Sequence, residues 1–155
     1  MTYRSFVIAA WLFASLASGC HRAAGNAVEI GAITAIRELG GRIEVDEKQS
    51  GQPVVKVYLH STTVKDADLV HIVQLKKVQS LFLAKTQITD EGLEFLREAH
   101  SLKTLSLNMT RVTDAGLKHL VGLTNLKTLN LQDTQVTEAG AAELKRKLSR
   151  VTIAR

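Results

Sequence analysis

The hydrophobic positions between Val54 and Arg150 recur with a period of about 24 residues. Two copies are clearest, VQSLFLAKTQITDEGLEFLREAHS from Val78 and LKTLSLNMTRVTDAGLKHLVGLTN from Leu102. A third copy opens at Leu126. A looser copy opens at Val54 and precedes the other three. A period of this length predicts a solenoid, in which each unit buries its apolar face against its neighbours.

Each repeat opens with an L-x-x-L-x-L spacing, which predicts a short strand with apolar and polar residues in alternation. In successive copies the three core positions are Val54, Val57 and Leu59; Val78, Leu81 and Leu83; Leu102, Leu105 and Leu107; and Leu126, Leu129 and Leu131. Placed side by side, these strands form a parallel sheet with a spacing of roughly 4.8 Å.

The residues after each strand predict a turn and then a helix. A threonine that can hydrogen-bond the backbone of the turn recurs at Thr62, Thr86, Thr110 and Thr134. Thr-Asp or Thr-Glu then favours a helix start, because threonine is a good N-cap and an acid suits the helix dipole. Glycine follows early in the helix at Gly92, Gly116 and Gly140, although it is unfavourable there by about 1 kcal/mol. We expect these glycines to allow close approach of successive helices, with Asp68 tolerated at the end of the stack.

Both ends of the repeat region carry further elements. Residues 28–39 predict an amphipathic helix with Ile30, Ile33, Ile36 and Leu39 on one side. Residues 42–46 alternate like a strand and residues 48–53 predict a turn, so that residues 28–53 form an N-terminal cap. At the other end, Leu148, Val151 and Ile153 again fit L-x-x-L-x-L and predict a short fifth repeat strand.

The pattern resembles the leucine-rich repeat family, L-x-x-L-x-L-x-x-N-x-L, with threonine in place of asparagine in all four copies. The V-T-D-A-G-L run is also similar to repeats of the helix-containing, ribonuclease-inhibitor-like kind. This resemblance covers about Val54 to Ile153. It implies an α/β solenoid in the shape of a short horseshoe arc, with parallel strands on the concave face and helices on the convex face. The family serves mainly as binding proteins, which implies a non-catalytic protein-binding module.

The N-terminus carries a separate signal. Arg4 precedes an uncharged run from Ser5 to Ser18, which is shorter than the roughly 20 apolar residues of a membrane-spanning helix and has the length of a signal-peptide core. Leu16-Ala-Ser-Gly-Cys20 resembles the lipobox of bacterial lipoproteins, with Ala17 where that family prefers leucine. The resemblance implies export, lipidation of Cys20 and anchoring in a bacterial membrane, on its periplasmic or cell-surface side. The alternative is an ordinary signal peptide that ends near a cysteine.

The cysteine content agrees with lipidation. Cys20 is the only cysteine, so that no intramolecular disulfide can form. The predicted organisation is a signal peptide (1–19), a tether outside the fold (20–27), the cap (28–53) and the repeats (54–77, 78–101, 102–125, 126–147 and a partial 148–155).

Specificity can reside only in the variable positions between the strand leucines, which face the concave side. Tyr58 and Phe82 occupy equivalent positions in adjacent strands and form an aromatic pair on an otherwise polar sheet. Exposed aromatic residues are favoured as binding anchors. The candidate binding residues are Lys56, Tyr58, His60, Phe82, Ser106, Asn108 and Asn130. Two alternatives to binding stay open: the cap covers the rings, or the rings pair across strands for stability.

Charge and motifs exclude several function classes. The net charge of +5 is modest, and nucleic-acid binding needs lysine and arginine clustered on one face. The five histidines are scattered over different elements, which argues against a metal site. Neither G-x-S-x-G nor H-E-x-x-H occurs, and no glycine loop fits a phosphate. We therefore expect no enzyme, no cofactor and no small-molecule substrate, and a protein partner; the alternative is a structural cell-envelope protein without a discrete ligand.

Overall fold

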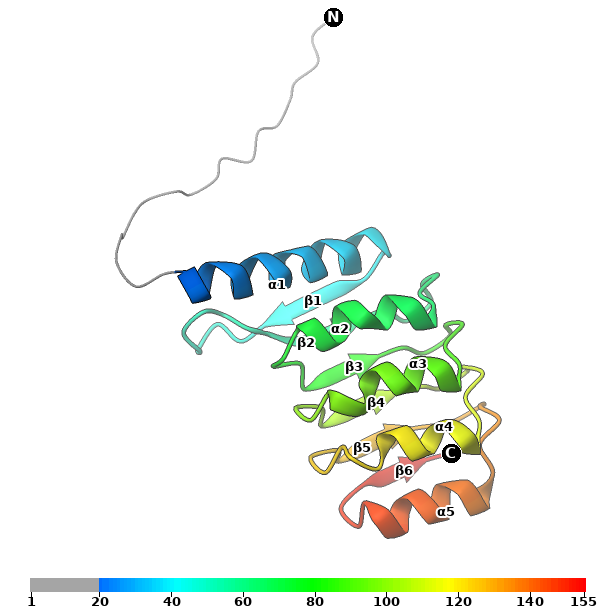
Figure 1. Ribbon diagram of the computed structural model, residues 1–155. Helices are drawn as coiled ribbons and strands as arrows, with labels where there is room; N and C mark the ends of the chain where they lie inside the picture. The colour runs from blue at the N-terminus through cyan, green and yellow to red at the C-terminus, as the bar shows by residue number, and fades with distance from the viewer. Residues whose placement is uncertain (1–19) are drawn as a thin grey trace, which may run out of the picture.

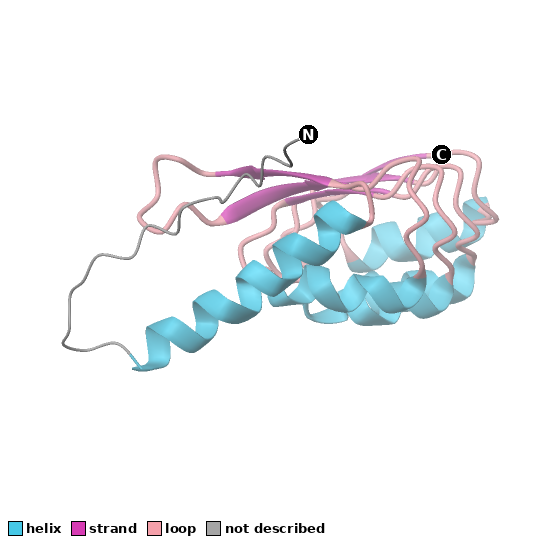
Figure 2. Cartoon of the chain, turned by 90° about the horizontal axis from the view of Figure 1, so that it is seen from above, coloured by secondary structure: helices cyan, strands magenta, loops and turns pink. Residues whose placement is uncertain are grey.

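The computed structural model describes residues 20–155, so that the predicted signal peptide lies outside the described residues. Figure 1 shows the repeats stacked one below another, and Figure 2 shows the strands on one side and the helices on the other. The strands are β1 (Arg42–Val45), β2 (Val54–Tyr58), β3 (Ser80–Phe82), β4 (Thr104–Ser106), β5 (Thr128–Asn130) and β6 (Thr152–Ala154). The α-helices are α1 (Cys20–Glu38), α2 (Val70–Gln74), α3 (Asp90–Phe95), α4 (Asp114–Leu117) and α5 (Glu138–Lys147). Three 3-10 segments join them, η1 (Asp66–Leu69), η2 (Leu96–Glu98) and η3 (Lys118–Leu120).

The six strands form one sheet in chain order, β1 to β6. From β2 onward the pairing is parallel, and equivalent repeat positions face each other: Leu81 pairs with Leu105 and Leu105 with Leu129. This register confirms the 24-residue period and the parallel sheet that the sequence predicted.

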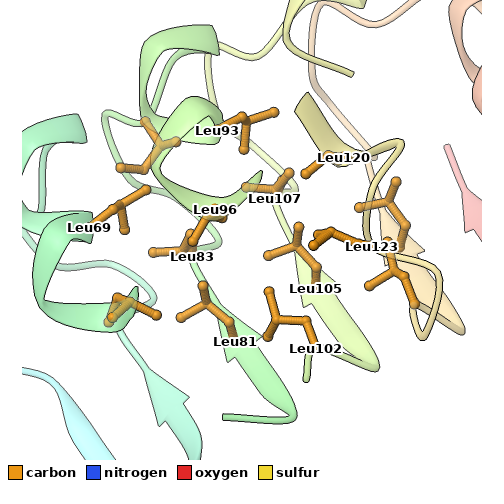
Figure 3. Close-up of a cluster of buried hydrophobic side chains, with 14 of the residues drawn as sticks. Leu69, Leu81, Leu83, Leu93, Leu96, Leu102, Leu105, Leu107, Leu120 and Leu123 are labelled. Atoms are coloured by element: carbon orange, nitrogen blue, oxygen red, sulfur yellow. The ribbon is translucent and has the colours of Figure 1, made fainter. Parts of the chain in front are cut away.

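The core lies between the sheet and the helices (Figure 3). Leu81 and Leu83 of one repeat, and Leu105 and Leu107 of the next, are fully buried. Figure 3 shows these leucines beside buried leucines of the helical segments, such as Leu96 and Leu120. Each repeat therefore completes its core only with the repeats on either side, as expected of a solenoid.

The turn after each strand is closed by the recurring threonine. The Thr110 hydroxyl donates to the Leu107 carbonyl oxygen at 2.6 Å, and Thr62, Thr86 and Thr134 make the same bond in their repeats. The residue just before the threonine has a positive φ of 55–58° in all four repeats, at Ser61, Lys85, Met109 and Asp133. The predicted role of the threonines is confirmed: the hydroxyl satisfies a carbonyl that the turn leaves without a strand partner.

Consecutive repeats are joined by an aspartate at the first position of η1, α3 and α4. The Asp90 carboxylate accepts from the Thr113 amide and hydroxyl groups of the following repeat, at 2.8 and 2.6 Å. Thr113 in turn accepts from the Ala115 amide at 3.2 Å, as an N-cap does. The pairs Asp66 with Thr89 and Asp114 with Thr137 repeat the aspartate–threonine contacts. In the last of these pairs, the Thr137 hydroxyl and amide hold the pKa of Asp114 below its usual range.

The same aspartates account for the helix glycines. A Cβ on Gly116 would lie 2.9 Å from the Asp90 Cγ and 3.1 Å from its Cα, with an even shorter approach to the carboxylate oxygen. Gly92 and Gly140 face Asp66 and Asp114 in the same way. The glycines thus make room for a carboxylate of the preceding repeat, which is more specific than the general helix approach expected from sequence. Asp68, at the glycine position of the first repeat, instead accepts from the Lys65 amide at 2.8 Å.

The N-terminal cap differs from the prediction in its helix. Helix α1 begins at Cys20, so that residues 20–27, expected to be a tether, are helical. Its buried side is formed by Ala32 and Ile36, whereas Ile30, expected on the core side, is 57% exposed. Ala32 and Ile36 are four residues apart and therefore lie on the same side of α1, which packs against α2 and β1. Ile30 does not lie on that side.

The cap strand continues the sheet. β1 pairs antiparallel with β2, and Arg42 faces Tyr58 while Glu44 faces Lys56. At the opposite end β6 pairs parallel with β5, which confirms a fifth repeat strand. Its register differs from the L-x-x-L-x-L alignment, because Ile153 faces Leu129 and not Leu131. The structure keeps the 24-residue period here, and Val151 is buried just before the strand.

Among the described residues, no helix is both long enough and apolar enough to cross a membrane.

Candidate binding face on the sheet

The sheet face is the surface made by the outward side chains of β1 to β6 and of the residues just after each strand. Every candidate residue named from the sequence lies on a strand of this face or within two residues of its end. The alternation with the buried leucines places Lys56, Tyr58, Phe82, Ser106 and Asn130 outward from the core. His60 and Asn108 follow their strands by two residues.

Four of the candidate residues form one contact group. The Tyr58 and Phe82 rings stack with centroids 4.9 Å apart and planes 3° from parallel. The His60 ring meets Tyr58 edge-on at 6.4 Å. Lys56 and Tyr58 share one carboxylate, that of Glu44, at 2.7 Å each. The rings therefore pair across strands, as expected if they contribute to stability, and both remain partly exposed.

The cap strand supplies two residues that sequence reasoning did not assign to the site. Glu44 accepts from the Tyr58 hydroxyl and pairs with Lys56. The Arg42 guanidinium lies 5.7 Å from the centre of the Tyr58 ring. The alternation in residues 42–45 places Arg42 and Glu44 on the same side, but their partners follow only from the register of the β1–β2 hairpin.

The charges in this group shift one another's pKa values. The pKa of Glu44 is lowered by its hydrogen bond with Lys56 and, to a smaller extent, by its hydrogen bond with the Tyr58 hydroxyl. The same carboxylate raises the pKa of Lys56 and the pKa of Tyr58. At neutral pH the group therefore holds an ionised glutamate, an ionised lysine and a neutral phenol, so that the tyrosine ring is fixed by its hydroxyl as well as by stacking.

The remaining candidate residues form a polar region next to the rings. The Ser106 hydroxyl donates to the Asn108 side-chain oxygen at 2.7 Å. The Asn130 side-chain oxygen accepts from the Gln132 amide at 3.0 Å. The structure thus joins the candidates into two neighbouring groups, an aromatic and charged group on β1 to β3 and an uncharged polar group on β4 and β5.

No group of three or more His, Cys, Asp or Glu side chains that could hold a metal ion is found in residues 20–155. His71, His100 and His119 belong to different helical segments or loops of the convex side, and His60 lies on the sheet face. The arrangement on the sheet face offers ring stacking, hydrogen bonds and fixed charges, which are contacts suited to recognition.

Sequence comparison with a family model agrees with the repeat geometry. Residues 74–96, 98–121 and 122–145 match a family model described as Leucine Rich repeat. Among solved structures, the chain is similar to an internalin (inlF) from Listeria monocytogenes str. 4b F2365, at 20% sequence identity and a TM-score of 0.45. That match covers 64% of this chain and 34% of the internalin, so that this chain spans about a third of the length of that structure. A comparison with curated protein sequences found no match.

Three successive repeats match the family model, and the strands pair at the same 24-residue interval. The three matched segments are therefore leucine-rich repeats, and they lie within an α/β solenoid whose strands run from β2 to β6.

Proposed function

We propose that this chain is a non-catalytic binding module that recognises a protein partner through its sheet face. The observation that carries the proposal is the stacked pair of Tyr58 and Phe82, which stays partly exposed in the middle of a polar sheet. The repeat scaffold is accounted for by the buried aliphatic residues and by the threonines, aspartates and glycines described above. An aromatic pair outside that set is available for a partner, and interface energy is concentrated in residues of this type.

The preorganised geometry of Tyr58 and Phe82 favours binding. Tyr58 is held by its hydrogen bond to Glu44, by Arg42 and by stacking on Phe82. Side chains that are already ordered lose little conformational entropy when a partner arrives. The small size of the sheet face limits the contact area, because a standard interface buries about 800 Å² on each partner. A contact area of this size suits a partner that binds with modest affinity, or a partner that contacts several copies of this chain at once.

Position-specific photocrosslinking tests this proposal. A photoreactive amino acid is placed at Thr128, which is exposed on β5, and in a matched chain at Glu94, which is exposed on α3. We expect a protein crosslink from Thr128 and none from Glu94, and a loss of about tenfold or more in yield with Tyr58→Ala and Phe82→Ala together. Crosslinks that form equally from Glu94, or that are unaffected by the double substitution, would contradict recognition through the sheet face. Thermal melting checks that each variant is folded.

We also propose that the protein is exported and anchored in a bacterial membrane by lipid on Cys20. Support comes from the Leu16-Ala-Ser-Gly-Cys20 run after an uncharged segment, and from the absence of a second cysteine in the sequence. Helix α1 starts at Cys20 and has 19 residues, a length of about 28 Å. A lipid at its first residue would therefore be joined to the cap by a helix and not by a flexible tether.

Metabolic labelling with a fatty-acid analogue tests the anchor. The full chain expressed in a bacterium is expected to incorporate the label and to sediment with membranes, and Cys20→Ala is expected to lose both properties. Tyr58→Ala serves as the matched control, because it leaves the N-terminal segment unchanged. Label that persists in Cys20→Ala would disprove lipidation at this residue.

A further inference from the structure

A single row of side chains crosses the sheet face at right angles to the strands. The strand register places Arg42, Tyr58, Phe82, Ser106 and Asn130 at successive positions on β1 to β5. Neighbouring strands are roughly 4.8 Å apart. The Tyr58 and Phe82 ring centroids are separated by 4.9 Å, which is almost the same distance. The axis of the ring stack therefore runs along the row, from strand to strand.

The two ends of this stack differ. At one end the Arg42 guanidinium lies over Tyr58, 5.7 Å from the ring centre. At the other end the next residue in the row is Ser106, whose short side chain is turned to Asn108 by a hydrogen bond of 2.7 Å. Ala84, two residues after Phe82, is also small. The row thus steps down in side-chain size directly beside the Phe82 ring, which is partly exposed.

Asn130 follows on the far side of this step. It lies one strand beyond Ser106, so that Phe82 and Asn130 are separated by two strand spacings, or roughly 10 Å. One flat group with a van der Waals contact on each face needs about 7–8 Å, so the space of roughly 10 Å admits one such group. The Asn130 side chain is held in place by the Gln132 amide, which donates to it at 3.0 Å.

We propose that the protein partner inserts an aromatic side chain above Ser106, where it stacks on Phe82 and becomes the third ring of the row. This inference rests on the proposed function and names the group that the sheet face recognises. A ring at this position repeats the offset-stacked geometry that Tyr58 and Phe82 already have. The amide of Asn130 lies at its opposite face, and the amide of Asn108 lies near its edge.

The charges around the row disfavour the other flat side chain, that of arginine. Arg42 and Lys56 are both positive, and the only carboxylate in their group, Glu44, already pairs with Lys56 and accepts from Tyr58. A partner guanidinium above Ser106 would lie two strand spacings from Lys56 and three from Arg42, and the carboxylate of that group is already paired, so the guanidinium would gain no charge partner there. An aromatic ring needs no charge partner, which is why the proposal specifies a ring.

The first test uses small probes on the full chain. N-acetyl-tyrosine amide is added during NMR measurements, with N-acetyl-leucine amide as the aliphatic control. We expect upfield ring-current shifts centred on Ser106, Ala84 and Phe82 that are several-fold larger with the tyrosine probe. Shifts that are equal for both probes, or that are spread over the molecule, would overturn the proposal.

The second test fills the position above Ser106 with a ring from the protein itself. Ser106→Phe places a ring of the protein's own on β4, and it is expected to abolish the tyrosine-probe shifts at Ala84 and Phe82. Thr128→Phe, on β5 of the same face but in a different row, is the matched control and should retain them. Shifts that survive in the Ser106→Phe protein would show that the probe binds elsewhere.

The crosslink to the protein partner distinguishes failure of the third-ring proposal from failure of the proposed function. With a photoreactive group at position 128, Ser106→Phe is expected to lower the yield by about 2- to 10-fold, the range for loss of one aromatic pair. If Ser106→Phe has no effect while Tyr58→Ala with Phe82→Ala abolishes the crosslink, the sheet face binds the partner but not by a third ring. If neither change has an effect, the proposed function itself fails.

Discussion

Replacing Gly116 by alanine is expected to destabilise the protein by about 3 kcal/mol, although alanine is the better helix former. The added Cβ would lie 2.9 Å from the Asp90 Cγ and 3.1 Å from its Cα, and it would push the carboxylate away from Thr113. Two hydrogen bonds between repeats, at 2.8 and 2.6 Å, would be lost or lengthened. Chemical denaturation of the two proteins measures the difference.

Two controls make this result specific. Gly31 lies in α1 with nothing within 4 Å of an added Cβ, so Gly31→Ala is expected to stabilise the protein by about 1 kcal/mol. The double change Asp90→Ala with Gly116→Ala is expected to be less destabilising than the sum of the two single changes, because the shortest contacts of the added Cβ, those with the carboxylate, are removed. Additive effects would show that the aspartate is not the reason for the glycine.

Leu105→Ala is expected to have the largest effect on stability of any change considered, about 3–5 kcal/mol. Leu105 is fully buried at the centre of β4, between Leu81 and Leu129 on the neighbouring strands. Truncation leaves a cavity that repeats on both sides would have to fill. Denaturant unfolding, followed by circular dichroism, measures the loss.

Ile153→Ala is the matched control for Leu105. Ile153 occupies the equivalent position on β6 but is only partly buried, and it has a paired strand on one side. We expect a cost of about 1 kcal/mol there. In a solenoid each repeat is stabilised by its nearest neighbours, so position along the stack should decide the cost of an identical truncation. Equal losses at the two positions would contradict this dependence.

The repetition of the sequence is what made the fold predictable. Leu81, Leu105 and Leu129 recur at one interval, and the structure pairs them in that register. The threonine bonds in the turns also followed from position alone, as Thr110 illustrates. Where only one copy of a pattern is present, the prediction is less accurate. The leucine-like spacing before β6 predicts one register, whereas the sheet holds Ile153 opposite Leu129.

The start of α1 and the full site depended on information that local patterns do not contain. Residues 20–27 lack the periodicity that marks an amphipathic helix, so the sequence does not predict their helical backbone. Tyr58 and Phe82 could be paired because they are one period apart. Glu44 belongs to the cap and has no equivalent in the repeats, so its contacts with Tyr58 and Lys56 required the hairpin register.

The contact of each aspartate with the glycine and threonine of the following repeat has a consequence for how such a chain can change in length. An inner repeat receives a carboxylate through its own glycine and threonine and provides one through its own aspartate, as Gly116, Thr113 and Asp114 do. A duplicated inner unit would therefore fit after any repeat that provides such an aspartate, without a compensating substitution. The first repeat has Asp68 where the others have glycine, so it lacks the space that admits a carboxylate of a preceding repeat. It could not take an inner position in the stack without substitution. Growth by whole 24-residue units is thus built into the joints, and each added unit would widen the sheet face by one strand.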